Sequence, residues 1–545
     1  MPRIRKSLQQ IENDFKERNT TELDNLIRAF RGIHRKDPLD PKSFFSIAGF
    51  HGEPFRGEGA TDPKWWGGYC NHGNVLFPTW HRAYLLRLED ALRSIPGCKD
   101  VTIPFWDECF GVPNSAPIPE VLTSPTYPLD NDDYNPLYSY TLQKALEEKV
   151  QGANERYSKH AGYTTVRYPL SGLVGTEEDR QQTEIHNAAY ADPMVRTQIL
   201  NANVANWLEG TVQIAPDPED PNTRQPDTFS VFERFKICLN APNYTVFSNT
   251  TSAAQYIIDH GQEDIDKHYV VSLESPHNAI HLAVGGFYQA GVYNADPIIG
   301  ANGDMGDNET ASFDPIFYLH HCFIDYVFWQ WQKRQGLTAP GSLTVIEDYP
   351  GTISADGVPG IPPGSVLDMN TYLYPFKKPD SQDWYTSNDL TDIEGQLGYS
   401  YGRGSLDIEH TPLLGSPHAA PLVAVKRVHN ISRAQFAGSF VIRTYARGPA
   451  HGPAGGNRVE IGREPVLSRW NVKGCANCQD KLSVQSLVPL DTKLLKFLGA
   501  ESARSDEGIV YEVEIQTHQG TTARGEPLLG AEPGDKPFSP KIDDL

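Results

Sequence analysis

The sequence predicts a mainly α core, an antiparallel helical bundle, followed by an all-β sandwich. Two different patterns of apolar residues along the 545-residue chain support this prediction. Before about residue 335, apolar residues recur at helical spacing, as Leu23, Ile27 and Phe30 do. From about residue 420, short apolar runs alternate with turn residues, which is typical of a sandwich. We therefore expect two domains, at 1–402 and 403–545.

Four helices of the predicted core matter most for function. A short apolar helix is expected at 43–51, and another begins at His81 with leucines along one face. Ser275 and Asp314 each precede a proline, the pattern of an N-cap residue followed by proline at the first helical position. Each of these helices begins or ends beside a histidine.

The C-terminal part has strand patterns separated by turn residues. A stretch rich in Pro, Gly, Ser, Thr and Asp at 336–400 leads into it, and the end from about Gly525 has the composition of a loose tail. The expected strands lie at 422–428, 438–445, 481–490 and 510–515.

Composition excludes several classes of partner. The formal net charge of −21 argues against nucleic acid and against an anionic membrane surface. No stretch approaches the roughly 18 apolar residues of a membrane span. Seven scattered cysteines do not form a disulfide framework, and the N-terminus has no apolar signal segment. We expect a cytoplasmic protein, with secretion and homo-oligomerisation left open.

The histidines fall into two groups. His277 and His281 stand four residues apart, so on a helix they share one face and can chelate one metal ion. His72 is expected in a loop and His81 in the first turn of the next helix, while His51 ends an apolar helix. Each of these residues, taken alone, also fits an ordinary buried or surface histidine.

A further histidine pair, His320 and His321, lies on a helix whose faces are both largely apolar, so the pattern does not choose between them. Few carboxylates accompany the two groups, which argues against a di-iron carboxylate bundle. Ligation by imidazoles alone suits copper or zinc. Taken jointly, the histidines predict two three-histidine sites in one core.

Two long motifs carry a resemblance to a known family. The segment 72–89, with Phe77, Trp80, His81 and Arg82, resembles the first copper signature of the tyrosinase and hemocyanin superfamily. The segment 314–325 resembles the second. The later Cys-Ala-Asn-Cys makes the chain most similar to filamentous-fungal tyrosinases.

This resemblance implies two copper ions with O2 as co-substrate. It implies that one ion is held by His51, His72 and His81 and the other by His277, His281 and His321, with His320 outside the ligand set. It also implies a thioether bond between Cys70 and His72. Many relatives have arginine where this chain has Tyr326, so Asp325 lacks its usual neighbouring partner.

The implied activity is ortho-hydroxylation of monophenols and oxidation of o-diphenols to o-quinones, which is melanin-type pigment chemistry. Small phenols are the implied substrates. Glu274 and Asn278 resemble a pair that holds the water which deprotonates the phenol, and Leu282 is expected at the substrate entrance.

For the C-terminal domain, the resemblance implies shielding. Cys475 and Cys478 form a CxxC motif suited to Cu(I), and they are expected to deliver copper from a donor protein. We expect the domain to cover the site until an activating protease removes it, with Val466 or Leu467 as a placeholder in the phenol pocket. The intact chain would then be latent.

Three alternatives stay open at this point. A catechol oxidase or o-aminophenol oxidase would have the same copper chemistry without monophenol hydroxylation. A non-catalytic O2-binding protein would exclude phenols permanently. A binuclear zinc hydrolase would use the same imidazoles but usually needs bridging carboxylates or water.

Overall fold

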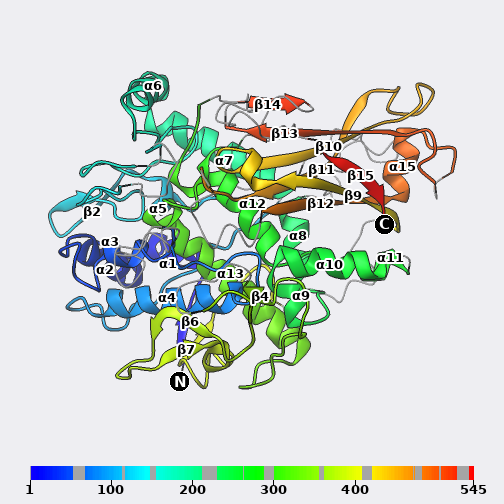
Figure 1. Cartoon of the computed structure of the whole chain (residues 1–545). Coiled ribbons are helices and arrows are strands. Elements are labelled where there is room, and N and C mark those ends of the chain that lie inside the picture. Colours follow the sequence, from blue (N-terminus) through cyan, green and yellow to red (C-terminus); the bar gives the residue numbers. More distant parts are fainter. Residues whose placement is uncertain are drawn as a thin grey trace.

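The computed structural model describes residues 2–52, 68–112, 117–147, 155–156, 158–210, 230–261, 263–287, 300–354, 361–407, 420–470, 472, 482–502, 505–518, 520–523 and 539–545. Its helices lie mainly before residue 336 and its larger sheets after residue 420, as the sequence predicts (Figure 1). The CxxC motif and the tail from Gly525 to about residue 538 lie outside the described residues.

Thirteen described helices precede the β-rich part, and a fourteenth, α15 (Thr492–Leu498), lies within it. The thirteen are α1 (Leu8–Lys16), α2 (Thr21–His34), α3 (Phe44–Ala48), α4 (Phe77–Arg93), α5 (Glu120–Thr123), α6 (Glu177–Ala188), α7 (Pro193–Glu209), α8 (Val231–Cys238), α9 (Tyr244–Ser248), α10 (Thr250–His260), α11 (Ile265–His268), α12 (Glu274–Gly285) and α13 (Ile316–Gln335).

Short 3-10 turns complete the helical elements: η3 (Asp304–Gly306), η4 (Ala311–Phe313), η5 (Ser387–Leu390) and η6 (Arg433–Gln435). Helix α4 begins four residues earlier than the sequence analysis places it, because Pro78 fits the first helical turn, where a missing N–H does no harm. His81 therefore lies in the second turn of α4. Helix α3 ends at Ala48, so His51 lies in the turn after it.

The centre of the helical part is formed by α4, α12 and α13. Every residue of α13 from Ile316 to Gln332 is buried, and so is every residue of α12. A helix that is buried on all sides forms the interior of a large domain rather than one amphipathic wall. The histidines on these helices are therefore shielded from water by the core itself.

The β-rich part consists of two antiparallel sheets that share one core. One sheet has the order β11-β10-β13-β14 and the other β12-β9-β15. Val428 and Val488 of the second sheet pack in the same apolar cluster as Ile442 and Ile515 of the first. This arrangement confirms the predicted sandwich. The strands are β9 (Leu422–Ser432), β10 (Phe440–Arg447), β11 (Arg458–Val466), β12 (Ser483–Asp491), β13 (Val510–Thr517), β14 (Gly520–Ala523) and β15 (Lys541–Asp544).

Small two-stranded ladders tie loops to the helical part. The parallel ladder between β1 (Arg3–Arg5) and β8 (Tyr399–Tyr401) joins the start of the chain to the end of the helical region. The others are β2 (Thr126–Leu129) with β3 (Asp132–Tyr134), β4 (Ile353–Ser354) with β5 (Ser365–Val366), and β6 (Tyr372–Lys377) with β7 (Trp384–Thr386). The boundary at residue 402 stays a prediction. Among the described helices, none has the length and apolar character that crossing a bilayer requires.

Candidate metal centre

The first histidine cluster joins three separate segments. His51 follows α3, His72 lies in the loop before α4, and His81 projects from α4. One ring nitrogen from each lies within 4.8 Å of the other two. His51 and His81 are buried, and His72 is partly exposed.

Backbone carbonyls set the tautomers of this cluster. Nδ1 of His51 donates to the carbonyl oxygen of Asn308 at 3.3 Å, and Nδ1 of His81 donates to that of Phe77 at 2.8 Å. A proton on Nδ1 leaves a lone pair on Nε2. The Nε2 atoms of His51, His72 and His81 are buried and have no hydrogen-bond partner among the described residues. Such orphaned acceptors fit a bound metal ion, since buried polar atoms are otherwise paired.

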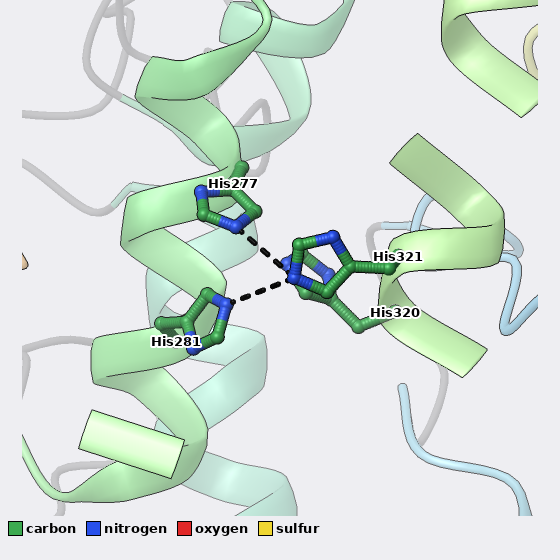
Figure 2. Close-up of side chains that lie close together, drawn as sticks. All are labelled: His277, His281, His320 and His321. Atoms are coloured by element: carbon green, nitrogen blue, oxygen red, sulfur yellow. Dashed lines mark hydrogen bonds between the residues drawn. The ribbon is translucent and has the colours of Figure 1, made fainter. Parts of the chain in front are cut away.

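The second cluster lies between α12 and α13, as Figure 2 shows. Nε2 of His321 is 3.3 Å from Nε2 of His277 and 3.4 Å from Nε2 of His281. Nδ1 of His277 donates to Asn278 Oδ1 at 2.9 Å, and Nδ1 of His281 donates to the Met305 carbonyl at 2.8 Å. Two lone-pair nitrogens thus point at a third. Edges of about 3.3 Å are those of a tetrahedron around an ion about 2.0–2.1 Å from each nitrogen.

His320 is the fourth histidine of this cluster, and a carboxyl group holds it. Its Nδ1 lies 2.5 Å from Oε1 of Glu108, and its ring stacks on His277 with centroids 5.2 Å apart. Burial raises the pKa of Glu108 well above its usual value. This contact occupies the Nδ1 side of His320 and leaves its Nε2 without a hydrogen-bond partner in the described structure.

The electrostatics keep the imidazoles neutral. Burial lowers the pKa of His81 to about 3 and that of His281 to about 4. The pKa values of His51, His72, His277 and His321 are also lowered well below the usual value, first by burial and then by the neighbouring imidazoles. Neutral imidazole is the form that binds a metal ion.

Asp325 obtains its partners from distant segments. It accepts hydrogen bonds from Arg82 at 2.6 Å, Arg5 at 3.4 Å, Tyr399 at 2.7 Å and Tyr401 at 2.5 Å. Burial alone would raise the pKa of Asp325, but the two arginines together with the Tyr399 and Tyr401 hydroxyls outweigh it and hold that pKa below its usual value. The arginine missing from the neighbouring position is thus replaced within the fold.

Tyr326 itself makes a separate contact, donating its hydroxyl to Asp407 at 2.9 Å. Phe317 packs where the two clusters meet: its ring centroid lies 4.1 Å from that of His321 and 4.9 Å from that of His51. Leu282 is fully buried in the apolar core that also contains Phe317.

Glu274 links helix α12, which carries His277 and His281, to the loop that carries His72. Its Oε1 accepts from the Gly73 backbone N–H at 2.8 Å, and its Oε2 accepts from the Thr250 N–H at 3.0 Å and from the Thr250 hydroxyl at 3.2 Å. Gly73 follows His72, so this carboxylate ties α12 to the loop of the first cluster. Asn278 lies on the same helix and contacts His277 directly.

The remaining predicted site residues have different outcomes. The Cys70 thiol is buried, and its sulfur accepts a hydrogen bond from the side-chain amide of Asn308 at 3.7 Å. Burial raises the pKa of this thiol to about 11. Val466 packs inside the sandwich core, whereas Leu467 packs in the main core together with the helical residues. Cys475 and Cys478 lie outside the described residues.

Sequence reasoning missed the groups that orient the histidines. Glu108 is 212 positions from His320, and Asn308 is 257 positions from His51. Neither belongs to a recognisable spacing with its histidine. The Met305 carbonyl has no side-chain signal at all, because any residue type would supply it.

The comparisons with known proteins agree with this geometry. The common central domain of tyrosinase matches residues 41–334. The tyrosinase HcTyr2 of Hahella sp. is 48% identical over 537 residues, covering 96% of this chain and 92% of its own. A tyrosinase of Aspergillus oryzae is 42% identical, with 87% of each chain covered.

Solved structures give the same result. Tyrosinase from Burkholderia thailandensis at low pH has a TM-score of 0.78 and 44% identity, covering 94% of this chain and 95% of that one. The two clusters of neutral histidines fit a binuclear type 3 copper site. The chain belongs to the tyrosinase family and is a copper oxidoreductase of that family.

Proposed function

We propose that this enzyme ortho-hydroxylates monophenols and oxidises o-diphenols to o-quinones, with O2 as co-substrate. One observation carries the proposal: the two imidazole clusters abut. The rings of His81 and His321 stack with centroids 4.5 Å apart and planes 14° apart. Metal ions held by the two clusters would therefore lie close enough to share one small ligand.

In this proposal His51, His72 and His81 hold one copper ion, and His277, His281 and His321 hold the other. When bound, the copper pair supplies O2 binding and electron transfer. The protein orients the imidazoles through Asn308, Phe77, Asn278 and Met305, which fix the Nδ1 protons. His320, held by Glu108, buttresses His277.

Glu274 and Asn278 are proposed to accept and hold the phenol proton through a water molecule. An ionised carboxylate has about four acceptor positions. Glu274 uses three of them on Gly73 and Thr250, so one is left for water. Asn278 lies one turn along the same helix. Leu282, the residue after His281, is proposed to limit substrate size.

The Cys70–His72 thioether is proposed on sequence proximity and burial. Burial keeps the Cys70 thiol protonated at neutral pH, because its pKa is about 11. Forming the carbon–sulfur bond removes one hydrogen from sulfur and one from the ring, and O2 takes up both as H2O2. A peptide containing both residues would then be two hydrogens lighter, and an unchanged mass would exclude the bond.

Latency of the intact chain is proposed from contacts of the C-terminal part beside both clusters. Ser439 donates to the Gly306 carbonyl at 2.7 Å, next to the Met305 carbonyl that orients His281. Arg469 donates to the carbonyl of Gly52, the residue after His51. Removal of the C-terminal part would release both contacts.

Arg234 forms a third bridge between the two parts. It donates to Ser275 at 2.7 Å and to Glu464 at 3.1 Å, so it links the start of α12 to strand β11. Since α12 carries His277 and His281, the C-terminal part is fastened to the helix of the second cluster.

Leu467 is the better placeholder of the two candidates. Its side chain joins the core of the helical part, whereas Val466 stays in the sandwich. Arg433 donates to the Leu467 carbonyl at 3.0 Å and thereby fixes this segment. The CxxC motif is proposed to pass copper from a donor protein, on the chemistry of its two thiols.

The test compares the copper-loaded intact chain with the same chain cleaved near residue 410 by an inserted protease site. We expect o-diphenol oxidation and monophenol hydroxylation to rise on cleavage. Diphenol oxidation alone would identify a catechol oxidase, and no activity with either substrate would identify an oxygen-binding protein. Equal activity before and after cleavage would exclude latency.

A further inference from the structure

A separate group of possible ligands lies away from the copper clusters, where α10 and α11 meet. It consists of His260, Glu263 and His268, and one ligand atom from each lies within 4.8 Å of the other two. His260 ends α10 and His268 ends α11. Figure 1 shows these two helices at the edge of the molecule, beneath the C-terminal strands.

Tyr256 orients both imidazoles. Its carbonyl oxygen accepts from Nδ1 of His260 at 2.8 Å, and its hydroxyl bonds to Nδ1 of His268 at 3.0 Å. The two rings stack with centroids 4.7 Å apart and planes 17° apart. With each Nδ1 engaged, Nε2 is the atom left for a metal. A hydrogen bond on the other ring nitrogen is the usual support of a metal-binding histidine.

Glu263 completes the donor set. Its Oε2 lies 3.1 Å from Nε2 of His268, and its side chain is 58% exposed, so an ion can approach from solvent. The neighbouring cation does not compete for it, because Lys267 pairs with Asp264 at 2.8 Å. An ion pair explains the contact between Glu263 and His268 but does not explain why the imidazole of His260 stacks on that of His268.

We propose that His260, Glu263 and His268 bind one Zn²⁺ ion. Two imidazoles and a carboxylate with one open position form a common zinc donor set. The site holds an ion distinct from the copper pair.

The position of this site gives the ion a mechanical effect. Asp266 of α11 accepts from the Leu422 N–H of β9 at 2.9 Å. Ile257 of α10 and Ile265 of α11 share an apolar cluster with Leu422 and Val425. An ion that joins α10 to α11 therefore stiffens the surface on which the sandwich rests.

The experiment titrates Zn²⁺ into the full-length, copper-loaded enzyme, removes loose ions by gel filtration, and measures both metals. We expect one zinc per chain with copper unchanged. His260→Ala and His268→Ala should lose that zinc and keep their copper. His429→Ala is the matched control and should keep the zinc, since His429 pairs with Asp543 at 2.6 Å and belongs to none of the three-ligand groups of the described structure.

Two further variants keep the test decisive. Glu263→Gln changes an exposed side chain and should lose zinc even where a histidine variant fails to accumulate. Tyr256→Phe should weaken zinc binding about 10-fold, because it removes one orienting hydrogen bond and no ligand. The proposal is overturned by an intact enzyme that retains no zinc, by zinc gained only as copper is lost, or by variants that bind zinc as the intact enzyme does.

Discussion

Arg82 donates to Asp325 at 2.6 Å, and this buried ion pair joins the helix that carries His81 to the helix that carries His321. Arg5 adds a second cation at 3.4 Å, from the strand at the start of the chain. The distance between the two histidine clusters is therefore set by charges as well as by apolar packing.

Replacement of Asp325 by asparagine should destabilise the fold strongly. It leaves the buried Arg82 without a counter-charge, whereas Arg5 keeps its pair with Glu89 at 2.9 Å. Breaking a buried pair costs about 3–5 kcal/mol. Urea unfolding of the copper-free chain measures this loss. The control is Glu177→Gln, because Glu177 pairs with Arg180 on the surface and such pairs contribute about 1 kcal/mol or less. Equal losses of unfolding free energy in the two variants would show that the Asp325 ion pair stabilises the fold no more than a surface pair does.

His34 should make stability depend on pH. Its Nδ1 donates to the Tyr134 hydroxyl at 2.9 Å, while Nε2 is buried without a partner in the described structure. Burial lowers its pKa from 6.5 to about 3. Between pH 6.5 and about 3, His34 therefore binds a proton in the unfolded chain but not in the folded chain.

Above pH 6.5 this histidine has no effect on stability. As the pH falls below 6.5 towards 3, folding loses about 1.4 kcal/mol per pH unit from this group. His34→Gln should flatten that part of the pH profile in urea unfolding, measured against the unchanged chain. An identical pH dependence of the free energy of unfolding in both proteins would show that folding does not lower the pKa of His34.

Leu467→Ala should raise o-diphenol turnover of the intact enzyme several-fold. The substitution removes apolar contacts between the C-terminal part and the helical core. Val466→Ala is the matched control, because Val466 packs within the sandwich. Steady-state rates at equal copper content compare the two. A greater rise with Val466→Ala would favour loosening of the sandwich over release of a placeholder.

Asn278→Ala should weaken copper binding about 10–100-fold, because it removes the group that orients His277. Copper retention under a competing chelator measures the effect. Asn203→Ala serves as control, because Asn203 donates to the Ala283 carbonyl on the same helix. Similar copper losses in both variants would assign the effect to helix α12 as a whole.

The fold class and the presence of two histidine clusters could be predicted from the sequence, because both rest on patterns of neighbouring residues. Strand alternation revealed the sandwich, and two long motifs located His81 and His321. The hydrogen-bond partners of the histidines could not be predicted from the sequence. Glu108, which holds His320, meets it only through tertiary folding, and nothing in the local pattern signals the pairing.

Asp325 illustrates the same limit. Its motif suggested a missing arginine, but the fold supplies Arg82 and Arg5 from α4 and β1. A pairing across 320 positions leaves no trace in one sequence. The sequence analysis did not single out His260, Glu263 and His268, which come together where α10 and α11 meet.

The number of copper ions per chain, measured together with the rate of diphenol oxidation, tests whether the chain holds two three-histidine copper sites. We expect two copper ions per chain in the intact enzyme. His277→Ala should retain one copper and no activity, while His320→Gln should retain both ions. Full copper content and activity in His277→Ala, or loss of copper only in His320→Gln, would contradict the assignment of two three-histidine sites.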